Sequence, residues 1–263
     1  MGVLNVTPDS FSDGGALHQH GKPSVDKALA RVEQMLDEGA AIIDVGGEST
    51  RPGAEPVSLT EELDRVVPVV EAITQRFETI VSVDTSSPDV MLAAAAAGAG
   101  MLNDVRALER PGAIAAAAKT GLPVCLMHMQ GQPKTMQQSP NYHSVVNEVS
   151  GYLQSRADAC IAAGIDRSRL LIDPGFGFGK SVEHNLGLLN HLSVLVELDY
   201  PVLVGLSRKS LIGKVLGRDV DQRLAGSLAL AVLAAERGAS IIRVHDVAET
   251  VDAVSLYSAV IAH

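Results

Sequence analysis

Eight short apolar segments, separated by longer segments of helical periodicity, constrain the fold of this 263-residue chain most strongly. They are residues 2–6, 41–45, 79–83, 101–103, 124–128, 170–173, 201–205 and 240–244. Each is a nearly continuous apolar run, which is typical of parallel strands buried on both faces. Eight β-α units with short connections predict an α/β fold, a (β/α)8 TIM barrel, formed by residues 1–263 as one domain. A doubly wound open sheet is the alternative, but it would not use all eight predicted strands.

The segments between the apolar runs carry helix boundary signals. Several of them stop at a glycine, and an apolar run follows within a few residues, which predicts a helix end and a turn into the next strand. These glycines are Gly39, Gly98, Gly121, Gly164 and Gly238. Asp246 and Glu249 have the spacing of a capping box, which predicts a capped helix start there.

Composition limits the function classes. With 46% hydrophobic and 20% charged residues the chain is not of the disordered class, and no apolar run approaches the roughly 18 residues of a membrane span. A formal net charge of −10 argues against a general nucleic-acid or membrane surface. Since no signal peptide precedes the first run, we expect a cytoplasmic protein. Cys125 and Cys160 have no metal-binding spacing and are expected to be reduced packing residues.

Polar residues end nearly every apolar run. In a TIM barrel the active site lies at the carboxyl ends of the strands, so these residues are the candidates for chemistry. They are Asn5, Asp44, Asp84, Asn103, Asp104, His128, Asp173, Ser207, Arg208, Lys209, Arg243 and His245. A single Asp or Asn at a strand end is more often a helix cap, but caps do not explain a full ring of polar side chains.

The mixture of side chains indicates the kind of ligand. Asp84, Asn103 and Asp173 can exchange hydrogen bonds with the edge of a flat, donor-rich heterocycle, whereas Lys209 and Arg243 suit an anionic group. A neutral side-chain oxygen such as that of Asn5 is a ligand that Mg²⁺ accepts beside substrate phosphates. The glycine-rich stretch at 173–180 matches neither G-x-G-x-x-G nor a P-loop, so it does not indicate a nucleotide site.

Seven motifs together closely resemble the dihydropteroate synthase family. They are NVTPDSFSDGG at 5–15, DVGGESTRPG at 44–53, SVDT at 82–85, LMHMQG at 126–131, DPGFGFGK at 173–180, SRKS at 207–210 and IRVHD at 242–246. The similarity covers essentially the whole chain and seven of the eight strand ends. It implies a transferase of folate biosynthesis that condenses 6-hydroxymethyl-7,8-dihydropterin diphosphate with 4-aminobenzoate, giving 7,8-dihydropteroate and pyrophosphate.

The resemblance also implies roles for particular residues. Asp84, Asn103, Asp173 and Lys209 would bind the pterin, and Arg243, Asn5, His245 and Thr50 would engage the diphosphate and its Mg²⁺, with Asn5 as the metal ligand. Lys209, Ser210 and Phe178 would meet the aminobenzoate, the ring that sulfonamides mimic. The remaining substrate-binding positions implied are Arg51, Met127 and Gly177, and the catalytic set is Asp84, Asp173, Lys209 and Arg243. A homodimer formed through the outer helices is expected as well.

Two other functions stay open from the sequence. A pterin-binding methyltransferase barrel shares the fold and the acids but has no need of the cations for a diphosphate. A non-catalytic pterin-binding domain would be expected to lack some of the polar strand ends, and none is missing here. The family resemblance further implies a short segment ahead of strand one that plugs the bottom of the barrel, whereas here the first predicted strand begins at residue 2.

Overall fold

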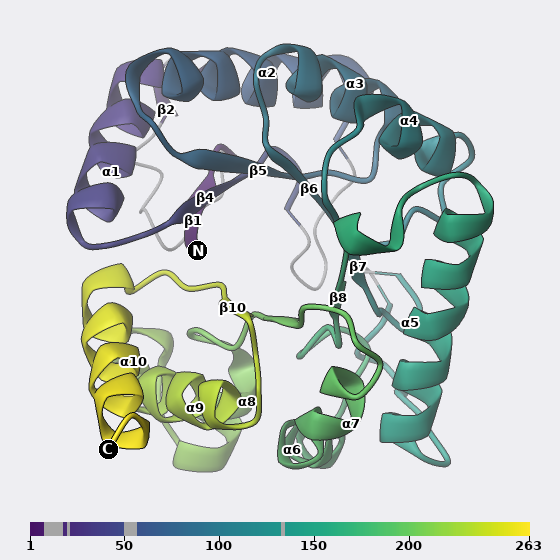
Figure 1. The fold of residues 1–263 in the computed structure, drawn as a ribbon. Coiled ribbons are helices and arrows are strands. Elements are labelled where there is room, and N and C mark those ends of the chain that lie inside the picture. Colours follow the sequence, from purple (N-terminus) through teal and green to yellow (C-terminus); the bar gives the residue numbers. More distant parts are fainter. Residues whose placement is uncertain (8–17, 20–21, 50–56, 133–134) are drawn as a thin grey trace.

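Eight parallel strands surround a common axis in the computed structural model, which describes residues 1–7, 18–19, 22–49, 57–132 and 135–263 (Figure 1). Six of them form one sheet in the order β1-β4-β5-β6-β7-β8, and β9 pairs with β10. The strands are β1 (Gly2–Asn5), β4 (Ile42–Gly46), β5 (Ile80–Asp84), β6 (Met101–Asp104), β7 (Val124–Met127), β8 (Leu170–Asp173), β9 (Leu203–Val204) and β10 (Ile241–Ile242). A short antiparallel pair, β2 (His18–Gln19) and β3 (Lys22–Pro23), lies outside the barrel sheets.

Two isolated parallel bridges close the barrel. Ile172 bridges to Val202 between β8 and β9, and Gly2 bridges to Val244 between β10 and β1. At the second seam the Val3 amide donates to the Val244 carbonyl at 3.0 Å, and the Val244 amide donates to the Met1 carbonyl at 2.9 Å. The predicted TIM barrel is therefore confirmed, although β9 and β10 are shorter than the segments 201–205 and 240–244.

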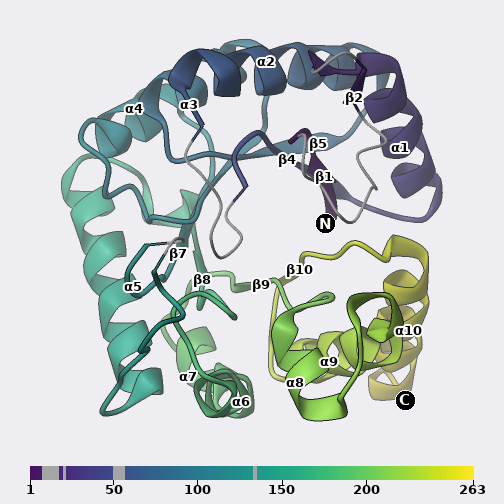
Figure 2. The same cartoon turned by 180° about the vertical axis from the view of Figure 1, so that it is seen from behind.

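Helices form a ring outside the strands, as the two opposite views show (Figures 1 and 2). They are α1 (Val25–Asp37), α2 (Leu59–Arg76), α3 (Pro88–Ala96), α4 (Ala113–Thr120), α5 (Val145–Ala162), α6 (Val182–Asn190), α7 (Leu192–Val196), α8 (Ser210–Leu216), α9 (Leu224–Glu236) and α10 (Val247–Ile261). All five predicted helix-ending glycines have a positive φ, between 73° and 98°. None of the helices within the described ranges has both the length and the apolar character that a membrane span requires.

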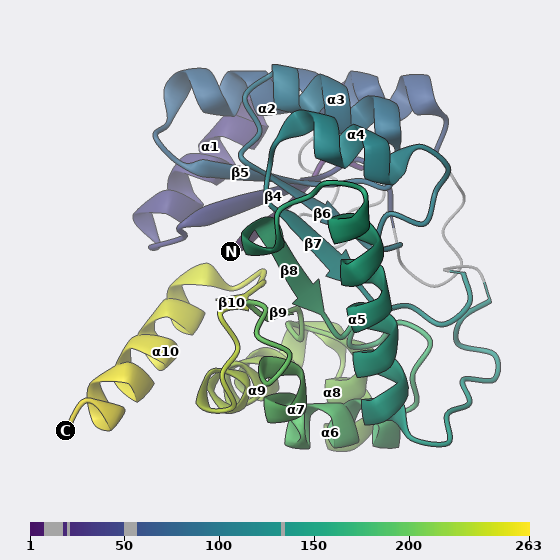
Figure 3. The same ribbon diagram turned by 45° about the vertical axis from the view of Figure 1, so that its right-hand side comes forward.

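Side chains alternate between the outer and inner face of each strand. Ile43, Val45, Val81 and Val83 are fully or almost fully buried in a core cluster with residues of α1, α2 and α3. The intervening residues of β4 and β5 consequently face the barrel interior. At the level of the strand starts the interior is filled by Met101, Cys125 and Leu203, with Leu171 and Ile241 packed against them. Figure 3 shows the strands β5 to β8 from the side.

Two local predictions were wrong in detail. Because β4 continues to Gly46, Asp44 lies two residues before the strand end, one layer deeper than expected. Asp246 is the N-cap residue of α10, but its side chain makes no capping bond. Its carboxylate instead accepts a hydrogen bond from Arg208, with Nε 3.0 Å from Oδ2, because a charged partner at this position competes with the helix backbone.

Candidate active site

The register of the sheet brings four strand ends to one level. Asn5 pairs with Gly46, Gly46 with Asp84, and Asp84 with Asn103 along neighbouring strands. A Cβ placed on Gly46 would lie 3.7 Å from Oδ1 of Asn5 and 3.9 Å from Oδ2 of Asp84. Both oxygens therefore lie beside a position that carries no side chain.

Arg243 reaches from β10 across to two aspartates of the large sheet. Its Nε donates to Oδ2 of Asp44 at 2.6 Å, and its Nη2 donates to Oδ2 of Asp84 at 3.3 Å. The Nδ2 of Asn103 donates to the same Oδ2 of Asp44 at 3.3 Å. The predicted residues Asp84, Asn103 and Arg243 are thus brought together, and Asp44, to which the sequence analysis assigned no role, contacts two of them, Asn103 and Arg243.

Asp84 lies in an environment that disfavours its charged form. Burial is the largest cause, followed by the nearby Asp44 carboxylate, and both outweigh the opposing effect of Arg243, so that the pKa of Asp84 rises to about 8. A positive charge that appears beside such a carboxylate strongly stabilises its ionised form, because that form then gains a partner of opposite charge.

Asp173 and Lys209 are a second pair of opposite charges, and each acts on the pKa of the other. The Gly175 amide donates to Oδ1 of Asp173 at 2.7 Å. Burial raises the pKa of Asp173, and Lys209 acts in the opposite direction. The Lys209 ammonium donates to the Phe176 carbonyl and lies 4.7 Å from the centre of the Phe178 ring. Burial lowers the pKa of Lys209 to about 8, although Asp173 favours its charged form.

The glycine-rich loop after β8 is fastened by Lys180, a residue for which the sequence analysis proposed no function. Its buried Nζ lies 2.9 Å from the Gly175 carbonyl, 3.0 Å from the Phe178 carbonyl and 2.9 Å from Nδ1 of His128. Burial lowers the pKa of Lys180 to about 7, and burial with the neighbouring lysine lowers that of His128 to about 3. The loop bearing Phe178 is therefore tied to the end of β7.

The other predicted site residues that the structure describes lie on or next to the same strand ends. Met127 ends β7 and is paired in register with Asp173, and a Cβ on Gly177 would lie 3.3 Å from Cδ of Lys209. Ser210 is exposed at the first position of α8. Nδ1 of His245 lies 3.1 Å from the Ser207 hydroxyl. Thr50 and Arg51 lie outside the described residues.

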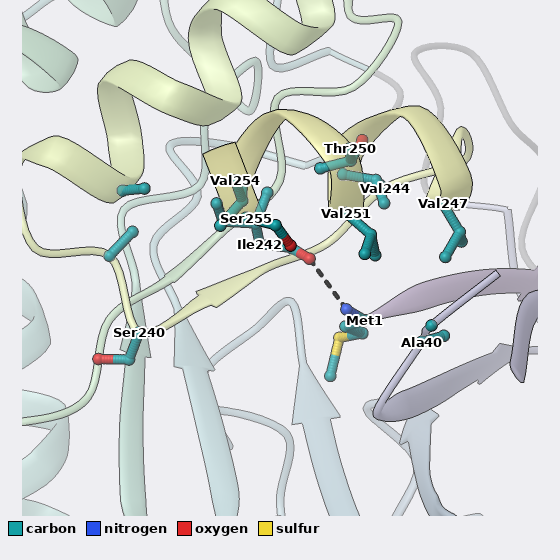
Figure 4. A pocket seen from close by; sticks show the side chains of 13 residues that line it. Met1, Ala40, Ser240, Ile242, Val244, Val247, Thr250, Val251, Val254 and Ser255 are labelled. Atoms are coloured by element: carbon teal, nitrogen blue, oxygen red, sulfur yellow. Dashed lines mark hydrogen bonds between the residues drawn. The ribbon is translucent and has the colours of Figure 1, made fainter. Parts of the chain in front are cut away.

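A separate cavity of about 290 Å³ lies at the opposite end of the barrel. Its lining includes Met1, Ala40, Ser240 and Ile242, which stand at or near the starts of strands, and side chains of α10 (Figure 4). None of the predicted site residues lines it. The chemistry-bearing side chains are therefore at the carboxyl ends of the strands, as the fold predicts.

No metal cage is preformed within the described part of the chain. No group of three or more His, Cys, Asp or Glu side chains there is arranged to bind a metal ion.

Comparison with known proteins connects this geometry to one family. The profile of the pterin binding enzymes matches residues 1–245. Dihydropteroate synthase of Haemophilus influenzae is 56% identical over 259 residues, covering 98% of this chain and 92% of that protein. A crystal structure of the Yersinia pestis dihydropteroate synthase with a sulfonamide drug superposes with a TM-score of 0.96 at 56% identity, covering 100% of this chain and 94% of the other.

A structure of the Xanthomonas albilineans dihydropteroate synthase in complex with 7,8-dihydropteroate is also similar, with a TM-score of 0.88 at 51% identity, covering 100% of this chain and 93% of that one. The matches extend over all eight strands and over both charged pairs at their carboxyl ends. The chain is therefore a member of the dihydropteroate synthase family of pterin binding enzymes.

Proposed function

We propose that this chain condenses 6-hydroxymethyl-7,8-dihydropterin diphosphate with 4-aminobenzoate, releasing pyrophosphate and 7,8-dihydropteroate. The observation that carries the proposal is the convergence of Asp84, Asn103 and Asp173 with the cations of Lys209 and Arg243 at one end of the barrel. Family membership and the dihydropteroate bound by the Xanthomonas albilineans relative support the same reaction.

In this proposal the carboxylates of Asp84 and Asp173 and the amide of Asn103 recognise the pterin by hydrogen bonds. A pterin presents several N–H groups along one edge, and Asp84, Asp173 and the Asn103 oxygen are acceptors for them. Because burial raises the pKa of both aspartates, each gains more from a hydrogen-bonding or positively charged partner than a solvated carboxylate would.

The aminobenzoate would bind beside the glycine-rich loop. Lys209 supplies a cation for the aminobenzoate carboxylate, Ser210 a hydroxyl, and Phe178 an aromatic face near the same ammonium. Sulfonamides would compete for this position, since a sulfonamide drug is bound in the Yersinia pestis relative. Met127 and Gly177 would complete the walls between the two substrates.

The diphosphate would lie toward Asn5 and His245, with Arg243 between it and the pterin ring. Thr50 is assigned to the same part of the site by family resemblance, and Arg51, which follows it in the sequence, is a further substrate-binding position that the resemblance implies. Asn5 would provide the protein ligand for Mg²⁺, and the ion would supply charge neutralisation to the diphosphate when bound.

The reaction would proceed by early cleavage of the bond between the pterin methylene and the diphosphate. An aryl amine is a weak nucleophile, so departure of pyrophosphate ahead of its attack is favoured over direct displacement. Asp84 would stabilise the positive charge that develops on the pterin. After the new C–N bond forms, the amine nitrogen would lose its proton to the released pyrophosphate or to water. Burial of the site would limit competition by water.

The Asp84→Asn variant tests this role. Asparagine keeps an acceptor oxygen but lacks the charge, so turnover is expected to fall about 100-fold while the dissociation constant of the pterin diphosphate changes only severalfold. Asp64→Asn, at an exposed position of α2, is the control. Pyrophosphate and dihydropteroate are followed in the same samples, with and without 4-aminobenzoate. Equal losses of binding and turnover would contradict the charge-stabilising role.

The same assay separates the alternatives. Product and pyrophosphate that both require 4-aminobenzoate would establish the synthase. Pterin binding without any pyrophosphate release would instead favour the non-catalytic domain, and methyl transfer from a methylated folate to a corrinoid protein would favour the methyltransferase barrel. The cations Lys209 and Arg243 favour the first outcome, because only the synthase substrate carries a diphosphate.

We also propose that two copies of the chain associate through the helices α8, α9 and α10. Large apolar side chains are exposed there, most of all Leu256, Val260 and Ile261, which are 69%, 67% and 64% exposed. A second copy covering them would remove apolar surface from water. Sedimentation analysis should give a dimer for the unaltered chain and a monomer for Leu256→Glu; an unaltered dimer in that variant would contradict this assignment.

A further inference from the structure

Asp44 is a fully buried carboxylate that no step of the proposed reaction uses. It lies in the interior of the barrel, one layer below the strand ends, and its side chain is 0% exposed. Its Oδ2 accepts from Nε of Arg243 at 2.6 Å and from Nδ2 of Asn103 at 3.3 Å. One oxygen atom therefore contacts two side chains that lie at the proposed pterin site.

The contact with Asn103 fixes the direction of an otherwise ambiguous amide. A carboxylate can only accept hydrogen bonds, so the amide must turn its NH₂ group toward Asp44. The Asn103 oxygen is then directed away from Asp44, where it can accept from a ligand. Reversal of this amide would present a donor in place of an acceptor and leave two groups mismatched.

The contact with Arg243 fixes the guanidinium in the same way. The Nε donates to Asp44 at 2.6 Å, whereas the Nη2 contact with Asp84 is longer, at 3.3 Å. The shorter contact is with Asp44, so Asp44 sets the orientation of the planar group and leaves Asp84 only partly engaged. Without Asp44, Asp84 would be the one of these two carboxylates left to pair with Arg243. The two side chains would then move together and occupy the proposed pterin position.

The other side of Asp44 has no partner from the described chain. Its Oδ1 and the hydroxyl of Ser82, its register partner on β5, are both buried without a hydrogen bond. A buried carboxylate with an unsatisfied oxygen is costly, so the position does not contribute to stability through its own contacts alone. A buried charge at this position is instead explained by its contacts with Asn103 and Arg243 at the strand ends.

We infer that Asp44 is a positioning residue of the pterin site, which holds Asn103 and Arg243 in the orientations that bind the pterin ring. The inference rests on the proposed function for its substrate, but its geometric part concerns only Asp44 on β4, Asn103 on β6 and Arg243 directly after β10. Because Asp44 is fully buried, it acts in this inference through Asn103 and Arg243 and not by contact with the substrate.

Two variants separate the geometry from the charge. Asp44→Ala removes both contacts, whereas Asp44→Asn keeps one oxygen that can accept from Asn103 or Arg243. We expect the KM for the pterin diphosphate to rise on the order of 30-fold in Asp44→Ala and clearly less in Asp44→Asn, because misplaced binding groups cost up to about 100-fold. The KM for 4-aminobenzoate should stay within about twofold of the original in both.

This pattern differs from that of a merely structural residue. A lower fraction of folded protein would reduce kcat and leave both KM values unchanged. Ser82→Ala, which removes a neighbouring buried polar group without contact to Asn103 or Arg243, is the matched control and should leave the pterin KM unchanged. An unaltered pterin KM in folded Asp44→Ala, or equal effects on both substrates, would overturn the inference.

Calorimetric binding of the pterin diphosphate without 4-aminobenzoate separates failure of the inference from failure of the proposed function. If the unaltered chain binds the pterin but makes no dihydropteroate, the proposed function fails, and the dissociation constants of the variants still test Asp44. Should Asp44→Ala not fold, a neutron diffraction structure of the unaltered chain with bound pterin decides, because neutrons distinguish an amide nitrogen from an amide oxygen, which X-rays at ordinary resolution do not. It should show the Asn103 oxygen toward the pterin and its nitrogen toward Asp44, and the reverse orientation would refute the assignment.

Discussion

The buried ammonium of Lys180 predicts an unusual dependence of stability on pH. Burial lowers its pKa to about 7 in the folded chain, against an ordinary value of 10.5. Between these values the unfolded chain binds a proton that the folded chain does not, so the folded state is favoured increasingly as pH rises. Each pH unit in this window adds at most about 1.4 kcal/mol to the free energy of unfolding.

Lys180→Met removes this titration and leaves the other groups in place. From pH 7.5 to 9.0 the free energy of unfolding of the unaltered chain should therefore rise relative to that of the variant by about 2 kcal/mol. Urea unfolding at several pH values measures the difference, and the contribution of Lys209 cancels because both proteins contain it. Lys119→Met removes an exposed lysine of α4 and serves as the control.

A constant stability difference across this range would refute the reasoning, because it would mean that Lys180 keeps its proton in the folded chain. A difference that falls with pH would contradict even the direction of the pKa shift. The same experiment reports on the loop, since the three acceptors Gly175, Phe178 and His128 lose their donor in Lys180→Met.

Three further predictions follow from the geometry. Gly175→Ala should destabilise the fold by several kcal/mol, measured by urea unfolding, because Gly175 has a φ of 65° and an added Cβ would collide with the His128 carbonyl. Burial raises the pKa of Glu62, so its charged form is disfavoured in the fold; Glu62→Gln should gain stability relative to the unaltered chain as pH rises from 4 to 7, and no change in that difference would contradict this. Phe178→Ala should raise the KM for 4-aminobenzoate about tenfold and leave that for the pterin diphosphate unchanged, which steady-state kinetics would check.

Hydrophobic runs were sufficient to predict all eight strands, because a strand buried on both faces must be apolar almost throughout. Their ends were harder to predict. The segment 201–205 contributes only Leu203 and Val204 as paired strand, since hydrogen bonding there depends on the curvature of the closing barrel and not on the local sequence.

The polar strand ends were predictable as a set, but their partners were not. Asp44 was identified as polar at a strand end, whereas its depth depends on where β4 stops, two residues later. A charged residue inside an otherwise apolar run was the available signal. Asp246 has the capping-box spacing, yet Arg208, 38 residues away in sequence, takes its carboxylate. Such long-range pairs follow from the closed fold and cannot be derived from local spacing.

The two charge types of the site belong to different sheets. The six-stranded sheet carries the acids and the amide: Asp44, Asp84, Asn103 and Asp173. The cations belong to the other sheet, since Lys209 follows β9 and Arg243 directly follows β10. The two sheets meet through the bridges Ile172–Val202 and Gly2–Val244.

An assembly intermediate that lacks the last quarter of the chain would therefore present clustered carboxylates without their counterions. Mutual repulsion would work against that intermediate until the cationic segment docks, so that electrostatic neutralisation and barrel closure become one cooperative event. The chain would then bind an anionic substrate only after the last step of folding. Its affinity for the substrate would therefore report whether the barrel has closed completely.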